Sequence, residues 1–284
     1  MMARAVPPGW YPLMQSGALK ARAVVRLFDG APVRLLRRRD GGVHAEGADT
    51  GAGRAACEAG GWVFVAYDLA PDEPAPAASL LDGPSSQLTL DGRVGATLGD
   101  VGENILDTTH TSVVHQGYLR RAGAQRLVEA RIESGDGWVS ATYPPGAAPS
   151  GWGARLLGAH RYTIRDTFRA PAIAEVAYTD DTAPVFIARF WLTPAAPDET
   201  YVAANIAVPG TGMVAALKLA ALRLFFLRIF AEDRDILELI ARNRAAHGKA
   251  PLVFAPQDML RPGIEAILAG RQPVTSAARM ALKV

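Results

Sequence analysis

The chain has a single cysteine, Cys57, among its 284 residues. A disulfide framework needs cysteines in pairs, and a zinc cluster or an iron–sulfur centre needs several ligands of this type from one chain. One cysteine therefore excludes all three as self-contained features. The scarcity of cysteine also fits a reducing cytoplasm, which is the location that we expect.

The chain also lacks a charge excess and a clean transmembrane run. Its 30 basic and 28 acidic residues leave a formal net charge of +2, which makes no case for a nucleic-acid partner. Residues 1–14 contain no apolar signal-peptide core. The most apolar stretch, residues 213–230, is interrupted by Lys218, Arg223 and Arg228. We therefore expect a buried or interfacial helix there and no membrane span.

What the chain does contain is ordinary for a soluble globular protein, with 49% hydrophobic and 20% charged residues. The first third is predicted to form strands at 22–28, 33–37 and 62–67, joined by tight turns. Residues 45–61 are small and glycine-rich, and we expect a loop. Four prolines at 70–86 indicate a linker. The predicted domains are therefore residues 1–75 and 76–284.

The second domain is predicted to be α+β. A helix is expected at 100–121, a long amphipathic helix at 211–246 that ends near His247 and Gly248, and a shorter helix around 258–269. Alternating apolar residues indicate an antiparallel sheet with one covered face. Its expected strands are 126–133, 138–143, 160–169, 173–179, 184–193 and 199–207. The predicted architecture is a curved antiparallel sheet packed against the long C-terminal helix.

A possible metal site starts from the segment ENILDTTHTSVVHQGY at 103–118, which holds His110 and His115 close to Asp107. Two imidazoles and one carboxylate form the facial triad of non-haem iron(II) oxygenases. On an ideal helix the two histidines would point about 140° apart, so the helix must be distorted or end between them. The distant carboxylate would come from residues 231–239. Its candidates there are Glu232, Asp233, Asp235 and Glu238. The alternative is a pair of structural histidines and a solvated acidic helix turn.

The sequence resembles the Rieske non-haem iron oxygenases, the alpha subunits of ring-hydroxylating and demethylating oxygenases. ENILDTTHTSVVHQGYLR is similar to their E-N-x-x-D-x-x-H-x-x-x-x-H signature, and FAEDRDILE to their E/Q-D-x-x-I/V-L/V-E helix. The segment GWYPLMQSGALKARAVVRLFDGAPVRLLRRRDGGVHA resembles the opening of their Rieske domain. The three blocks occur in the family's order.

The resemblance implies roles for individual residues. His110, His115 and Asp233 match the iron ligands, so the implied cofactor is Fe(2+). Asp107 matches an acid that hydrogen-bonds a metal histidine and links to the Rieske cluster of the adjacent subunit, and Asn104 matches a residue close to the iron. The implied fold is a small Rieske-like β domain followed by a helix-grip (START-like) catalytic domain.

One departure concerns the Rieske cluster, which needs two cysteines and two histidines. After VHA, where the first C-x-H pair belongs, the chain reads EGADTGAGRAA. Placing Cys57 on the second cysteine puts Gly60 where a histidine is needed. We therefore expect residues 1–75 to form a degenerate domain with no iron–sulfur cluster of its own.

The implied function is a terminal oxygenase that uses O2 to hydroxylate or oxidatively demethylate a small, largely apolar substrate. Its electrons would come from a partner protein or subunit with a Rieske domain, within a homo- or hetero-oligomer. Candidate substrate contacts on the sheet are Phe186, Phe190, Trp191 and Asn205, although core packing explains them equally well. Two alternatives stay open. One is a structural subunit of a Rieske oxygenase, and the other is a metal-free ligand-binding module.

Overall fold

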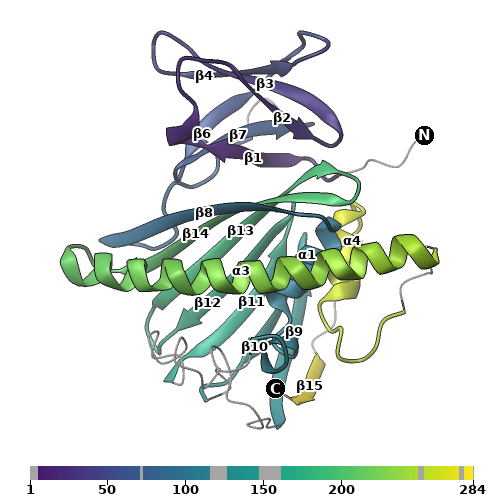
Figure 1. Ribbon diagram of the computed structural model, residues 1–284. Coiled ribbons are helices and arrows are strands. Elements are labelled where there is room, and N and C mark those ends of the chain that lie inside the picture. Colours follow the sequence, from purple (N-terminus) through teal and green to yellow (C-terminus); the bar gives the residue numbers. More distant parts are fainter. Residues whose placement is uncertain are drawn as a thin grey trace.

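The computed structural model of the chain describes residues 6–70, 73–115, 127–146, 161–248, 253–274 and 278–283. Two small β-sheets lie on one side of a large curved sheet, and the long helix α3 crosses the other side (Figure 1). Helices and an antiparallel sheet occupy separate layers, so the predicted α+β class is confirmed. The division at residue 75 stays a prediction.

The N-terminal part forms a three-stranded sheet of order β1-β7-β6 and a four-stranded sheet of order β2-β3-β4-β5. The strands are β1 (Gly9–Gln15), β2 (Val24–Phe28), β3 (Ala31–Arg37), β4 (Val43–Gly47), β5 (Gly53–Arg54), β6 (Ala56–Ala59) and β7 (Trp62–Tyr67), with a 3-10 turn η1 (Ser16–Ala18). The prediction of a loop over 45–61 is wrong, because β5, β6 and the end of β4 lie within it. Their glycines and alanines show no period of two, and pairing with neighbouring strands supplies the order that the local sequence does not.

The large sheet has eight antiparallel strands in the order β15-β9-β10-β11-β12-β13-β14-β8. They are β8 (Ser85–Val94), β9 (Leu127–Gly135), β10 (Trp138–Tyr143), β11 (Thr163–Arg169), β12 (Ile173–Thr179), β13 (Pro184–Ala196), β14 (Glu199–Pro209) and β15 (Ala278–Lys283). The predicted linker fits residues 73–84, which have no regular structure. The edge strands β8 and β15, and β1 in the small sheet, were not expected from the sequence.

The helix α3 (Met213–His247) covers the inner face of this sheet (Figure 1). Ala215, Leu219, Leu222 and Phe225 are buried at intervals of three or four, which places them on one side of the helix. The helix ends before Gly248, whose φ of 81° suits glycine and interrupts the helical backbone. The predicted long helix and its end are confirmed. Within the described residues, no helix is long and apolar enough to cross a membrane.

Helix α1 (Leu98–Leu106) begins at Thr97, whose hydroxyl accepts a hydrogen bond from the backbone N–H of Asp100. The expected helix over 100–121 is wrong beyond residue 106, and residues 116–121 lie outside the described part. The Asp107 carboxylate accepts bonds from the backbone N–H groups of Thr109 at 2.7 Å and His110 at 3.2 Å. These bonds compete with the helical pattern, so the chain leaves α1 and forms the 3-10 turn η2 (His110–Ser112).

The outer face of the large sheet packs against the small sheets. Trp62 and Phe64 of β7 form a buried cluster with Trp191, Tyr201 and Ala203 of β13 and β14. The rings of Phe64 and Trp191 meet edge to face with centroids 5.7 Å apart. The C-terminal helix α4 (Arg261–Leu268) packs beside α1. Helix α4 also contacts β10 and β11, so α1, α3 and α4 share the inner face of the sheet, and the site lies between α1 and α3.

Candidate metal centre

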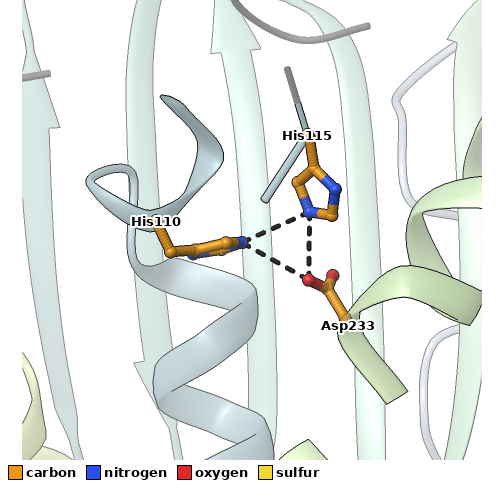
Figure 2. Close-up of side chains that lie close together, drawn as sticks. All are labelled: His110, His115 and Asp233. Carbon is orange, nitrogen blue, oxygen red and sulfur yellow. Dashed lines mark hydrogen bonds and ion pairs between the residues drawn. The ribbon is translucent and has the colours of Figure 1, made fainter. Parts of the chain in front are cut away.

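His110, His115 and Asp233 converge on one point between η2 and the middle of α3 (Figure 2). The Nε2 atoms of the two histidines are 3.3 Å apart. The Asp233 Oδ1 atom lies 3.0 Å from Nε2 of His115 and 3.5 Å from Nε2 of His110. The early end of α1 makes this possible, since the two imidazoles no longer share one helical surface.

The mutual distances fit three adjacent ligands of one metal ion. Bonds of about 2.1 Å at right angles would place neighbouring donor atoms about 3.0 Å apart, and tetrahedral angles would place them about 3.4 Å apart. The observed 3.0, 3.3 and 3.5 Å span these values. Two imidazole nitrogens and one carboxylate oxygen on one side of an ion leave its other positions open, as in the iron(II) facial triad.

Each of the opposite ring nitrogens lies beside a further carboxylate. Nδ1 of His115 lies 2.9 Å from Oε2 of Glu232, and Nδ1 of His110 lies 3.5 Å from Oδ2 of Asp107. A carboxylate beside Nδ1 favours the tautomer that carries its proton there. Both Nε2 lone pairs then point at the same space as the Asp233 oxygen.

Three converging lone pairs repel one another unless a positive charge lies between them. Oδ1 of Asp233 is buried, and within the described part of the chain its polar contacts are the ion-pair distances to these two Nε2 atoms, with no regular hydrogen bond. Burial lowers the pKa of His110, but Asp107 and Asp233 outweigh it and raise this pKa to about 9. Burial raises the pKa of Asp233, but the two histidines bring it down to about 2. The group thus stabilises one shared positive charge, and its donor set fits a divalent metal ion.

The other acids of residues 231–239 point elsewhere. The side chain of Asp235 is 74% exposed. Glu238 accepts a hydrogen bond from the backbone N–H of Gly95 at 3.3 Å. Glu232 binds Nδ1 of His115, on the side of the ring away from the metal position, and also pairs with Arg228 at 2.6 Å. The sequence had placed Glu232 only among the possible ligands. Its position directly before Asp233 in FAEDRDILE is a signal for a supporting role.

Glu232 gives a first prediction. Replacing it with alanine removes the acceptor that orients His115, and the metal affinity is expected to fall roughly 10- to 100-fold. The measurement is a competition titration of iron(II) against a chelator under anaerobic conditions. The control is Arg228→Ala, which removes the exposed partner of Glu232 but leaves the contact with His115. Equal affinities for the two variants would contradict the assigned role of Glu232.

An apolar cavity of about 180 Å³ opens beside these residues, between the inner face of the sheet, α1 and α3. Asn104 and Asp107 line it together with His110, His115 and Asp233. The apolar wall comes from Ile164, Val176, Tyr178, Phe186, Ala188, Phe190, Val202, Ala204, Ile206, Phe225, Phe226 and Phe230. The structure therefore brings the sequence-predicted metal and catalytic residues together beside a space that suits a small apolar molecule.

Two of the four predicted substrate contacts lie on the cavity side and two do not. Phe186 and Phe190 line the cavity. Trp191 packs in the outer cluster, and the Asn205 side chain accepts a hydrogen bond from the Trp62 indole and donates one to the Gly60 carbonyl at 2.8 Å. Their assignment as substrate contacts is therefore corrected. Successive strand residues face opposite sides, so Phe190 and Trp191 could not both face the cavity.

Asn205 gives a second prediction. Its replacement with alanine leaves the buried Trp62 N–H and Gly60 C=O without their partner, and is expected to lower the free energy of unfolding by about 1–3 kcal/mol. Chemical denaturation measures this loss. Metal affinity is expected to stay at the wild-type value, because Asn205 lies on the outer face. A variant with normal stability and weakened metal binding would show that Asn205 belongs to the site.

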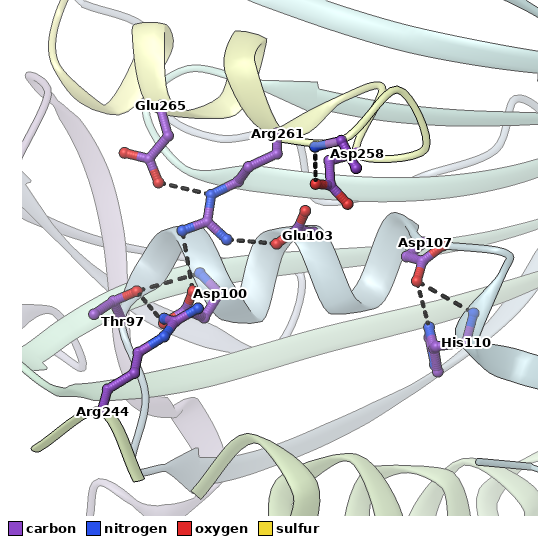
Figure 3. Close-up of polar contacts among 10 residues, drawn as sticks. Thr97, Asp100, Glu103, Asp107, His110, Arg244, Asp258, Arg261 and Glu265 are labelled. Carbon is purple, nitrogen blue, oxygen red and sulfur yellow. Dashed lines mark hydrogen bonds and ion pairs between the residues drawn. The ribbon is translucent and has the colours of Figure 1, made fainter. Parts of the chain in front are cut away.

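A charged network joins α1 to α4 and to the C-terminal part of α3 (Figure 3). The guanidinium of Arg261 at the start of α4 is 3% exposed and pairs with Asp100, Glu103 and Glu265. Arg244 of α3 adds a contact of 2.8 Å to Asp100. Since α1 leads directly into Asp107 and His110, this network also fixes the position of His110.

The N-terminal sheets contain one histidine and one cysteine, the residue types that bind a Rieske cluster, and both have other contacts. Nε2 of His44, on β4, lies 3.2 Å from Glu46. Cys57, on β6, packs against the buried cluster of Trp62 and Phe64. Across the ranges that the structure describes, the one group of three or more metal-type side chains with donor atoms within 4.8 Å of each other is His110, His115 and Asp233.

Comparisons with known proteins agree with this geometry. The family profile described as the vanillate O-demethylase oxygenase C-terminal domain matches residues 94–262, more than half of the chain. No curated protein matches the sequence significantly.

Solved structures carry the comparison further. Dicamba monooxygenase bound to dicamba has a TM-score of 0.72 at 16% identity, over 92% of this chain and 96% of that chain. NdmA from Pseudomonas putida CBB5 with caffeine has a TM-score of 0.69 at 14% sequence identity, over 95% of each chain. The terminal oxygenase of carbazole 1,9a-dioxygenase from Nocardioides aromaticivorans IC177 has 0.64 at 14%, over 95% of each. Identities this low show a shared fold only.

The profile covers both the histidine pair and Asp233, and the fold similarity extends over nearly all of the chain. The resemblance to Rieske oxygenase alpha subunits is therefore confirmed. The chain belongs to the family of the vanillate O-demethylase oxygenase C-terminal domain, the catalytic domain of Rieske oxygenases.

Proposed function

We propose that this chain is a terminal oxygenase component that holds one non-haem iron(II) ion through His110, His115 and Asp233. It hydroxylates or oxidatively demethylates a small, largely apolar, aromatic or heterocyclic substrate. The observation that carries this proposal is the convergence of three donor atoms within 3.5 Å of one another at the wall of an apolar cavity. Iron bound there would supply the activation of O2.

The residues around the site have separate roles in this proposal. Glu232 binds Nδ1 of His115 and Asp107 lies 3.5 Å from Nδ1 of His110, so both carboxylates favour the tautomer whose Nε2 lone pair is directed at the metal position. Asn104 lines the cavity beside Asp107 and is the candidate for orienting a polar group near the metal. Phe186 and Phe190 provide apolar surface that excludes water and binds an aromatic ring.

The reaction sets a requirement for electrons. In demethylation a methyl ether, O2, two electrons and two protons give an alcohol, formaldehyde and water. In hydroxylation one oxygen atom enters the substrate and the other leaves as water, again with two electrons. A Rieske cluster needs two cysteines, and this chain has one. We infer that a Rieske centre on a partner protein or subunit delivers the electrons, and that the assembly is a cytoplasmic homo- or hetero-oligomer. The side chain of Asp107 is 30% exposed, and we infer that it lies on the route of these electrons.

The test combines metal analysis with turnover. The protein is loaded anaerobically with iron(II), freed of excess metal and analysed for iron. It is then mixed with O2, a reduced Rieske-type ferredoxin and a panel of O-methyl and N-methyl aromatic compounds. The expected result is O2 uptake matched by formaldehyde or a hydroxylated product. The matched control is His110→Ala, which is expected to lose both iron and product formation.

Other outcomes would favour the alternatives. A protein that binds no iron and co-purifies with a complete oxygenase alpha subunit would be a structural subunit. A protein that binds aromatic ligands but no metal would be a ligand-binding module. A protein that binds iron but forms no product with any reduced Rieske donor would contradict the catalytic part of the proposal.

A further inference from the structure

Asp166 is a carboxylate in an apolar wall of the cavity. It lies on the inner face of β11, opposite Ala141 of β10 and Val176 of β12. Its neighbours on the same face of its own strand, two residues away on either side, are Ile164 and Phe168. The side chain is only 2% exposed and lines the same cavity as the metal-site residues.

One oxygen of this carboxylate lacks a hydrogen-bond partner in the part of the chain that the structure describes. Oδ1 of Asp166 is buried and makes no hydrogen bond to any residue that the structure describes. A buried polar group without a partner destabilises the fold, so such groups in stable proteins are generally satisfied by something. Burial first, and then the charge of Asp107, raise the pKa of Asp166 well above its ordinary value. A bound molecule with a complementary polar group would satisfy this carboxyl.

The other charges around the cavity restrict that molecule. Asp107 and Asp233 serve the histidines, and Asp91 at the cavity wall already binds Gln15 and Tyr201. Among the lining residues that are described, the basic side chain outside the histidines is Arg234, which is 43% exposed and lies 3.8 Å from Asp235. Apart from a metal ion at His110, His115 and Asp233, the described lining therefore offers little to balance a negative charge on a substrate.

We propose that Asp166 is the specificity-determining residue that binds a basic nitrogen of the substrate, so that amines and nitrogen heterocycles are preferred over aromatic carboxylates. This inference rests on the proposed function and names the substrate class of the same site. A basic nitrogen satisfies Asp166 in either protonation state. The neutral acid donates its proton to the nitrogen lone pair, and the carboxylate accepts a hydrogen bond from a protonated nitrogen. An aromatic carboxylate would instead add a negative charge beside Asp107.

The test compares three probes of similar shape, which are quinoline, naphthalene and 2-naphthoate. Their dissociation constants for the iron-loaded protein are measured by isothermal titration calorimetry at pH 7 without O2. We expect quinoline to bind at least about tenfold more tightly than naphthalene, because a site built for a hydrogen bond rejects the analogue that lacks it. We expect 2-naphthoate to bind most weakly.

Two variants assign the preference to Asp166. In Asp166→Leu, quinoline is expected to lose about tenfold in affinity and to bind like naphthalene, since an apolar side chain of similar size replaces the carboxyl. The iron ligands are unchanged there, so the loss does not report coordination of quinoline to iron. The control Val176→Leu alters the same wall without changing its polarity and is expected to affect both probes equally.

The outcomes separate this inference from the proposed function. Equal binding of quinoline and naphthalene to the wild type overturns the inference without any variant, as does a quinoline preference that persists in Asp166→Leu. A protein that oxidises substrates but shows no preference overturns the inference and leaves the oxygenase function intact. A protein that prefers quinoline through Asp166 but never uses O2 supports the binding role and contradicts the oxygenase function.

Discussion

Replacing Asp233 with alanine is expected to reduce bound iron from about one ion per chain to below about 0.1. Its carboxylate supplies the one anionic donor of the site, and without it the imidazoles of His110 and His115 face a buried apolar space. The measurement is elemental analysis after anaerobic loading and gel filtration. Thermal unfolding provides a second measurement. Iron(II) should raise the melting temperature of the wild type but not of the variant, because a metal that binds only the folded state stabilises it.

The matched control for this prediction is Asp235→Ala. Asp235 lies two residues further along α3 and is 74% exposed. Its loss changes the charge of the helix equally but removes no donor from the site, so iron content and thermal shift should stay at wild-type values. Iron retained by Asp233→Ala at the wild-type level, or lost equally from both variants, would show that the metal lies elsewhere.

Replacing Arg261 with methionine is expected to cost about 3 kcal/mol of folding free energy, near the lower end of the effect of breaking a buried ion pair. The guanidinium is 3% exposed and lies 3.0, 2.5 and 2.7 Å from carboxylate oxygens of Asp100, Glu103 and Glu265 (Figure 3). Methionine keeps most of the packing volume but leaves these acids without their common partner. Arg244 still neutralises Asp100, which limits the loss.

Urea denaturation of the metal-free protein measures this effect, and Arg279→Met is the control. Arg279 is 79% exposed and lies 3.4 Å from Glu129, a pair expected to contribute less than about 0.5 kcal/mol. The two variants lose the same charge. If they unfold at the same urea concentration, the network around Arg261 is not a major source of stability.

The Arg261 network and the metal site meet in α1. The helix is fixed at its start by Thr97, Asp100 and Arg261, and it ends where Asp107 captures the backbone of Thr109 and His110. Weakening the network should therefore also lower iron affinity, since the position of His110 follows from the position of α1. Glu232 and Asp233 are held separately by α3, so the loss should be smaller than that caused by Asp233→Ala.

The sequence by itself determined the elements with strong local patterns. The alternation in VFIARFWLT and the spaced apolar residues of α3 predicted the sheet and the long helix, because these periods follow from backbone geometry alone. The pair His110 and His115, followed more than a hundred residues later by FAEDRDILE, was enough to suggest a metal site. The single cysteine was enough to argue against a cluster held by this chain.

The tertiary structure decided what depends on contacts between distant segments. It separated Asp233 from Glu232, Asp235 and Glu238, since only the rotation of α3 against the sheet fixes which acid faces the histidines. It turned Trp191 and Asn205 toward the small sheets, and it ordered residues 45–61 as strands through pairing with their neighbours. It also placed Asp166 in an apolar wall of the cavity. The proposed binding role of this carboxyl depends on residues from neighbouring strands, which the sequence around Asp166 does not reveal.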